Sequence, residues 1–182
     1  MMDPMIILAL IVLVVVALIG ERFRRTGRRA EWLRREGMPE ELRTAKLVAS
    51  EQHYRCQKPV ALSGTPDQVY RLPEGALVVV DTKRRPRAQV YDADIAQLSI
   101  YRVLLAAQKA FRGQPLAAYG YVRLVTPEGV VYRRVELWDT ARVVALHRRY
   151  WALRDKRDTP TGAETAGLCR WCGHRERCGL AR

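Results

Sequence analysis

The sequence predicts an α/β fold in which helices flank a mixed β-sheet. Short segments rich in β-branched residues alternate with segments of helical periodicity. Segment 76–81 is apolar on both faces up to its last residue, as is typical of a central strand covered on two sides. The predicted order is helix, three strands, helix, two strands and helix, which gives a sandwich of helices around a mixed sheet.

The composition indicates one folded domain that is attracted to polyanions. The chain has 182 residues, is 48% hydrophobic and carries a formal net charge of +13 at pH 7. This hydrophobic content excludes a disordered chain, and the length is enough to bury a core without disulfides. The positive charge attracts nucleic acid or an anionic membrane surface, and charge alone does not choose between them.

Residues 1–20 predict a membrane anchor. The run from Met5 to Gly20 is apolar and uncharged, slightly below the roughly 20 residues that usually span a bilayer. A signal peptide and a buried core helix are the alternatives, but the segment starts acidic and has no convincing cleavage site. Arginines follow at once, as is typical of the cytoplasmic side. We expect a single-pass protein of the inner, cytoplasmic membrane whose globular domain lies in the cytoplasm.

Periodicity and turn residues divide the rest of the chain. A basic tether, 21–37, is expected to contact membrane lipid and to precede a core at 38–157 and a cysteine cluster at 158–182. The expected helices are 39 to about 55, 92–112 and 140 to about 156. In the last of them Val143, Val144, Leu146 and Trp151 are the expected core residues. The expected strands are 60–62, 68–72 and 76–81, then the hairpin of 116–125 and 130–137.

The end of the central strand carries a candidate catalytic group. Asp81 and Lys83 are two residues apart, so on a strand they point to the same face. Asp67 belongs to the preceding arm of the same hairpin, which brings its carboxylate near Asp81. Two close carboxylates stay ionised when a cation bridges them, and hard oxygen ligands suit Mg²⁺ or Mn²⁺. Glu51 is the candidate third carboxylate, with His53 as its rival.

A solvated strand end with an ion pair is the ordinary explanation of an isolated Asp-x-Lys pair. Three further features favour a site. Gly64-Thr65-Pro66-Asp67 forms a turn upstream, Gln97 and Tyr101 share one face of the next helix, and a basic run follows the lysine. The basic residues are Arg84, Arg85 and Arg87.

Together these motifs resemble the PD-(D/E)XK nuclease superfamily. The resemblance rests on Pro66-Asp67, Asp81-Thr82-Lys83 and Gln97-Leu-Ser-Ile-Tyr101, the last being similar to the RecB-like branch. It implies a restriction-endonuclease-like core, with Asp67 and Asp81 as metal ligands and Lys83 as the catalytic lysine. It also implies that Gln97 and Tyr101 support the site, and that the activity is cleavage of DNA, often exonucleolytic on single strands.

Four cysteines suggest a second metal centre. Cys169, Cys172 and Cys178 lie within ten residues, a spacing that indicates metal ligation rather than a disulfide framework. Cys56 is the only other cysteine and would complete a set of four. The spacing resembles that of the iron–sulfur CRISPR-associated exonucleases, which implies a [4Fe–4S] cluster. Zn²⁺, with His174 or Cys56 as fourth ligand, and unligated cysteines are the alternatives.

The sequence thus predicts a membrane-anchored, divalent-metal-dependent deoxyribonuclease, an exonuclease acting on single-stranded DNA in DNA processing, repair or defence. One alternative is an inactive nuclease fold kept as a nucleic-acid-binding or scaffold module at the membrane. Another is a zinc-knuckle membrane adaptor without a nucleic-acid role.

Overall fold

The computed structural model describes residue 21 and residues 36–163, 166–170 and 172–180. It divides into two compact units, 1–139 and 140–182. The predicted membrane anchor, 1–20, and nearly all of the tether lie outside the described residues. Among the described helices, none combines the length and apolarity needed to cross a bilayer.

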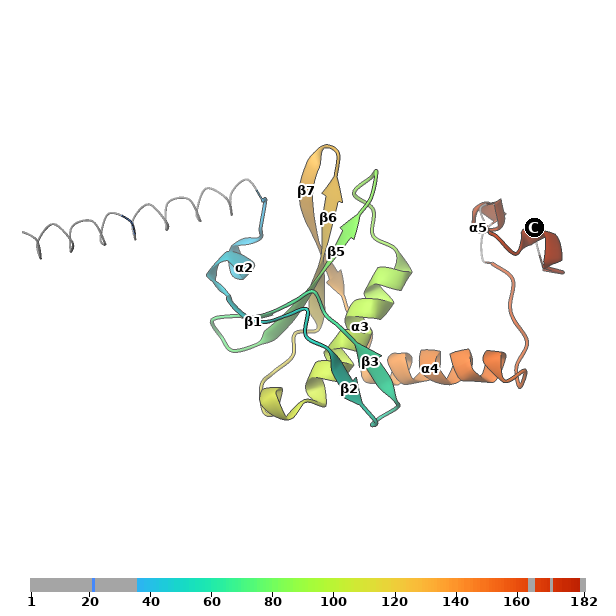
Figure 1. Ribbon diagram of the computed structural model, residues 1–182, viewed down its shortest axis with the longest axis horizontal. Coiled ribbons are helices and arrows are strands. Elements are labelled where there is room, and N and C mark those ends of the chain that lie inside the picture. Colours follow the sequence, from blue (N-terminus) through green and yellow to red (C-terminus); the bar gives the residue numbers. More distant parts are fainter. Residues whose placement is uncertain (1–20, 22–35, 164–165, 171, 181–182) are drawn as a thin grey trace, which may run out of the picture. The chain divides into compact units, whose positions relative to one another are not determined.

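A five-stranded mixed sheet forms the centre of the first unit (Figure 1). Its strands lie in the order β1-β4-β5-β6-β7, and only the β5–β6 pair is parallel. The central strand is β5, so its backbone is paired on both sides. The strands are β1 (Lys46–Ser50), β4 (Gln68–Arg71), β5 (Leu77–Arg84), β6 (Tyr119–Thr126) and β7 (Gly129–Glu136). This agrees with the predicted mixed sheet, including both hairpins.

Helix α3 covers one face of this sheet (Figure 1). The helix runs from Asp92 to Ala106 and continues into a short 3₁₀ turn, η1 (Lys109–Phe111). Its buried leucines pack with Val79 of β5 in the larger of two hydrophobic clusters. A small hairpin, β2 (Tyr54–Cys56) and β3 (Leu62–Gly64), contacts the same helix.

Alternation along β5 separates two hydrophobic layers. Val79 belongs to the layer against α3, whereas Val78 and Val80 belong to the opposite layer with Leu42. Each of these side chains is at most 2% exposed. Because side chains on a strand alternate between faces, the odd-numbered positions after Val79 also face α3. This alternation fixes where Asp81 and Lys83 point.

The expected helix from 39 to about 55 is wrong. Helix α2 spans only Glu40–Thr44, Ala45 is already extended, and β1 then pairs antiparallel with β4. The apolar residues of this segment fit a helical spacing, but the free backbone edge of β4 offers a full set of strand hydrogen bonds instead. Glu51 and Cys56 therefore belong to the sheet region and not to a helix.

The second unit contains α4 (Thr140–Arg154), α5 (Ala166–Arg170) and a 3₁₀ turn, η2 (Arg175–Arg177). Of the core residues predicted for α4, Val143 is buried, but Leu146 is 42% exposed. Leu146 was therefore wrongly predicted as a core residue. Helix α4 groups with the cysteine segment in this division, whereas the domain boundary at 157/158 stays a prediction.

Candidate active site

The outer end of β5 presents acidic and basic side chains toward α3. The strand is buried from Leu77 through Asp81 and becomes partly exposed from Thr82 onward. Asp81 is only 3% exposed, so a carboxylate stands where the hydrophobic core ends. Lys83 lies one pleat further along the same face.

Four side chains from β5 and α3 form a continuous hydrogen-bonded group. Lys83 Nζ lies 2.8 Å from Asp81 Oδ2 and donates to Gln97 Oε1 at 2.7 Å. The amide of Gln97 in turn donates to Asp81 Oδ1 at 3.0 Å and to the Tyr101 hydroxyl at 2.7 Å. Gln97 and Tyr101 are one helical turn apart, as the sequence predicted, and both face the strand.

Asp67 reaches the same region from the start of β4. Its Oδ2 accepts a hydrogen bond of 2.7 Å from the backbone N–H of Thr82, between Asp81 and Lys83. The antiparallel β4–β5 register, which pairs Gln68 with Val80, places the two aspartates on adjacent strands. The structure therefore brings together Asp67, Asp81, Lys83, Gln97 and Tyr101.

Burial makes this site electrostatically unusual. Removal from water raises the pKa of Asp81, the ion pair with Lys83 partly offsets this, and the charges of Asp67 and Asp94 raise it further. Asp81 Oδ2 is buried and, apart from the Lys83 ion pair, has no hydrogen-bond donor among the described residues. A buried carboxylate oxygen with spare lone pairs beside a second carboxylate can accept a cation.

The sequence matches the model of the PD-(D/E)XK nuclease superfamily over residues 14–179. The chain belongs to this superfamily. No curated protein matches the chain. A solved structure titled "Crystal structure of SSO0001" is similar to it, with a TM-score of 0.44 and 15% identity over 88% of this chain and 69% of that one.

Members of the PD-(D/E)XK superfamily are generally metal-dependent nucleases that use Mg²⁺ or Mn²⁺. Asp67 and Asp81 fit such an ion, because Mg²⁺ is commonly held by one or two carboxylates and keeps several waters. Within the described ranges, no group of three or more His, Cys, Asp and Glu side chains is placed to hold a metal. Among the residues that the structure describes, a third protein carboxylate is therefore not gathered with the two aspartates.

Glu51 follows β1 directly, in the left-handed region with a φ of 50°. Its backbone N–H donates to the carbonyls of Pro66 and Asp67, both at 3.1 Å, which fixes its main chain beside the turn that carries Asp67. Its side chain is exposed. The backbone thus places Glu51 next to Asp67, while its carboxylate points into solvent-accessible space.

His53, the rival of Glu51, already uses both ring nitrogens. Arg55 Nε donates to His53 Nε2 at 3.1 Å, so Nε2 is the acceptor and Nδ1 carries the proton. Nδ1 then donates to the hydroxyl of Thr65 at 3.0 Å. Metal ligation by His53 would require breaking one of these bonds.

Gly64 has a packing role that sequence reasoning missed. A Cβ at this position would lie 2.8 Å from Cε1 of Tyr101 and 3.2 Å from a methyl group of Leu104. Only a residue without a side chain lets the strand approach the tyrosine this closely. The sequence identifies Gly64 as part of the turn before Asp67, but only the fold reveals that the ring of Tyr101 packs directly against it.

The basic run after Lys83 contains an ion pair that the sequence did not predict. Arg85 donates to both oxygens of Asp94, at 2.6 and 2.7 Å, and the backbone N–H of Tyr91 donates to Asp94 as well. Burial tends to raise the pKa of Asp94, but these hydrogen bonds outweigh it and the pKa is lowered. The period of two along the strand could have indicated that Arg85 faces α3.

The four cysteines are all free thiols. In the second unit Cys169 is buried, Cys172 and Cys178 are exposed, and turn hydrogen bonds link Cys172 to Cys169 and Cys178 to Arg175. In the first unit the thiol of Cys56 lies 3.6 Å from the carbonyl of Val60. The predicted metal ligation by the cysteines remains a prediction from their spacing.

Proposed function

We propose that the protein is a divalent-metal-dependent DNA nuclease whose site is built on Asp67, Asp81 and Lys83. The observation that carries the proposal is the closed group of Lys83, Asp81, Gln97 and Tyr101, beside which Asp67 binds the backbone of Thr82. In the described part of the chain, Lys83 Nζ is the one group beside the buried Asp81 Oδ2, so this oxygen keeps a lone pair with which it could bind a cation.

Each residue has a distinct proposed role. Asp67 and Asp81 hold a Mg²⁺ or Mn²⁺ ion, with Glu51 as the third carboxylate once the ion is bound. When bound, such an ion supplies Lewis-acid activation of water and stabilises charge on a phosphoryl oxygen. Lys83 positions the attacking water and a phosphate oxygen by donating from Nζ, and Gln97 keeps that ammonium aimed at Asp81.

We place the protein in the RecB-like branch and propose exonucleolytic action on single-stranded DNA. Support for the branch comes from Gln97 and Tyr101, whose side chains take part in the hydrogen-bonded group of Asp81 and Lys83. A [4Fe–4S] cluster on Cys56, Cys169, Cys172 and Cys178 is the finer proposal for the cysteines, with Zn²⁺ as its alternative. Spacing is its support, and iron and sulfide analysis of anaerobically purified protein tests it.

We also propose that residues 1–20 anchor the protein in the cytoplasmic membrane with its domain in the cytoplasm. The uncharged apolar run and the arginines behind it support this topology. Extraction behaviour of the full chain tests it: retention in membranes through an alkaline carbonate wash supports an anchor, and release by that wash contradicts one.

One observation favours the alternative of an inactive, DNA-binding nuclease fold. No third ligand is gathered with the two aspartates in the described parts of the chain. The test is cleavage of end-labelled single- and double-stranded DNA and of circular single strands by the full chain in detergent, with Mn²⁺ or with EDTA. Mn²⁺-dependent loss of linear but not circular strands supports the exonuclease. Binding of DNA without any cleavage supports the scaffold instead.

A further inference from the structure

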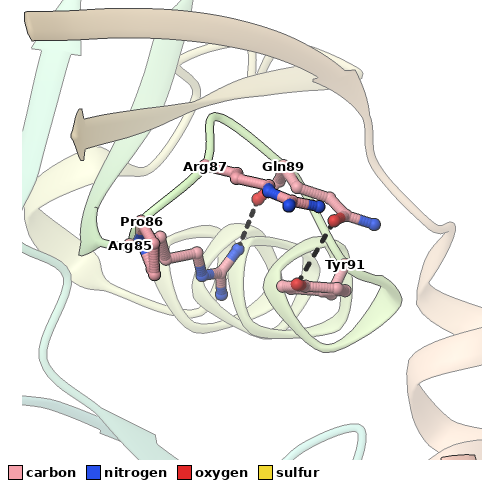
Figure 2. Close-up of a pocket in the computed structure, with 5 residues that line it drawn as sticks. All are labelled: Arg85, Pro86, Arg87, Gln89 and Tyr91. Carbon is pink, nitrogen blue, oxygen red and sulfur yellow. Dashed lines mark hydrogen bonds between the residues drawn. The ribbon is translucent and has the colours of Figure 1, made fainter. Parts of the chain in front are cut away.

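A hollow of about 530 Å³ lies beside the proposed catalytic group, in the loop that joins β5 to α3. Five residues line it: Arg85, Pro86, Arg87, Gln89 and Tyr91. Figure 2 shows their side chains gathered over the first turn of α3, with Arg85 and Tyr91 below Arg87 and Gln89. Its size is within the range of sites that bind small organic groups.

One residue that lines the hollow, Arg85, belongs to the same row of side chains as the catalytic residues Asp81 and Lys83. Asp81, Lys83 and Arg85 follow one another at a spacing of two, and the backbone N–H of Arg85 still bonds to Val125 of β6 at 3.1 Å. Two residues of a strand span roughly 6 to 7 Å. A ligand in the hollow would therefore be an immediate neighbour of a group bound at Lys83.

Arg85, whose charge is compensated by Asp94, forms the floor of the hollow. Its guanidinium is held by both oxygens of Asp94 and by the carbonyl of Gln89 at 2.7 Å, and lies 4.5 Å from the centre of the Tyr91 ring. Because Asp94 compensates the charge of Arg85, the guanidinium acts toward a ligand mainly as a flat surface and less as a cation. Fixed planar groups of this kind bind other flat groups by stacking.

Two exposed side chains supply a ring on which a base can stack and a cation that can bind a phosphate. Tyr91 is 49% exposed although it packs on Arg85, so its ring remains accessible to a ligand. Arg87 is exposed and has no carboxylate partner among the described residues. An accessible aromatic ring next to a cation is the arrangement with which proteins bind single-stranded nucleic acid, through base stacking and phosphate contact.

We infer that this hollow is a subsite for one unpaired nucleotide adjacent to the scissile phosphate, with the base on Tyr91 and Arg85 and a phosphate on Arg87. The inference rests on the proposed nuclease function for its location and concerns binding alone. A base that occupies the hollow has left the stack of its own strand, so the subsite favours single-stranded ends over duplex.

The test separates base contacts from phosphate contacts by fluorescence anisotropy in EDTA, where no cleavage occurs. The probes are a deoxythymidine strand of about twelve nucleotides, within the usual site size, and a base-free strand of equal length. Loss of the stacking ring in Tyr91→Ala should weaken binding of the deoxythymidine strand about 5- to 150-fold and leave the base-free strand unchanged. Tyr91→Phe, which keeps the ring, should bind both strands like the wild type.

Arg87→Ala should weaken the binding of both strands by the same factor. It should also reduce the salt dependence of the affinity by about the amount that one phosphate contact contributes. Arg112→Ala is the matched control, since Arg112 is also exposed but directly follows η1, beyond the C-terminal end of α3. Unchanged affinity of Tyr91→Ala for the deoxythymidine strand, or an equal loss on both strands, would overturn the subsite. Absence of cleavage by the wild type would refute the proposed function and leave this binding comparison intact.

Discussion

The two faces of the central sheet each bury a polar network, and the two networks differ in one respect. On the α3 face, burial raises the pKa of Asp81, and the ammonium of Lys83 is the one partner of its Oδ2 among the described residues. On the opposite face, Glu41 of α2 accepts hydrogen bonds from the hydroxyls of Tyr119 and Tyr121. The Asp81 carboxylate therefore keeps lone pairs with which it could bind a cation, whereas each oxygen of the Glu41 carboxylate already accepts a hydrogen bond.

The opposite face contains a second glutamate, Glu36, whose carboxylate is bonded to side chains of the sheet. Arg123 of β6 forms an ion pair with Glu36, and Tyr132 of β7 donates to the same carboxylate at 3.4 Å. Both carboxylates come from the short segment before β1 and bond to strand residues that are 78 to 96 positions away in the chain. These contacts hold the first residues of the domain against the sheet, so this network is structural.

The largest difference is expected for Asp81→Asn. The change removes a charged ligand, so metal-dependent cleavage should fall by more than about 100-fold. Because burial raises the pKa of Asp81, its ionised form costs stability at neutral pH, and the amide should leave the thermal midpoint unchanged or higher. Cleavage rates and a thermal melt of the same preparation measure both. A variant that melts earlier and still cleaves would assign Asp81 to structure.

Gln97→Leu should have the next largest effect on activity. It removes the amide that joins Asp81, Lys83 and Tyr101, so cleavage should fall by about 10- to 100-fold and require more Mn²⁺. The measurement is the rate across a Mn²⁺ titration. Gln108→Leu near the end of the same helix is the matched control, because its amide bonds only to backbone carbonyls. Equal losses in the two variants would contradict the positioning role.

Glu41→Leu should show the reverse pattern on the opposite face. The change leaves the hydroxyls of Tyr119 and Tyr121 without their acceptor, which should lower the free energy of unfolding by about 1 to 3 kcal/mol. Cleavage by the folded protein at low temperature should stay at the wild-type rate. Denaturant titration gives the stability, and a large loss of cleavage with unchanged stability would refute the comparison.

The smallest expected effect is a loss of stability in alkali. Burial and the hydrogen bond to Glu41 raise the pKa of Tyr119 from 10.0 to about 12, and the same causes raise that of Tyr121. The folded state thus holds protons that the unfolded state releases, so the free energy of unfolding should fall from about pH 10 to pH 12. Denaturant titrations across this range should show a shallower fall for Tyr119→Phe/Tyr121→Phe. An identical slope would contradict the assignment.

The sequence predicted the α3 face far better than the opposite one, for a physical reason. Asp81 and Lys83 share a strand, and Gln97 and Tyr101 share a helix, so their periodicities alone place each pair on one face. The buried run before Asp81 identified the central strand. The Arg85–Asp94 pair, the bond from the Thr82 backbone to Asp67 and the close packing of Gly64 on Tyr101 required the three-dimensional fold.

The network of Glu36 and Glu41 could not be predicted, because no local period links residues so far apart in the chain. The segment after α2 failed for a related reason. Leu42, Ala45 and Val48 match a helical spacing, yet β1 forms because β4 offers an edge with which to pair. Tertiary hydrogen bonding thus overrode a local pattern, and it moved Glu51 from a helix to the end of a strand.

The central claim is that the α3-face network performs catalysis and is not a stabilising ion pair. The most direct measurement compares DNA cleavage in Mn²⁺ by the wild type and by Lys83→Ala, with the melting temperature of each recorded in the same buffer. We predict that the lysine variant loses cleavage by about 100-fold or more while it still folds and binds DNA. Robust cleavage by the folded Lys83→Ala protein would contradict the account.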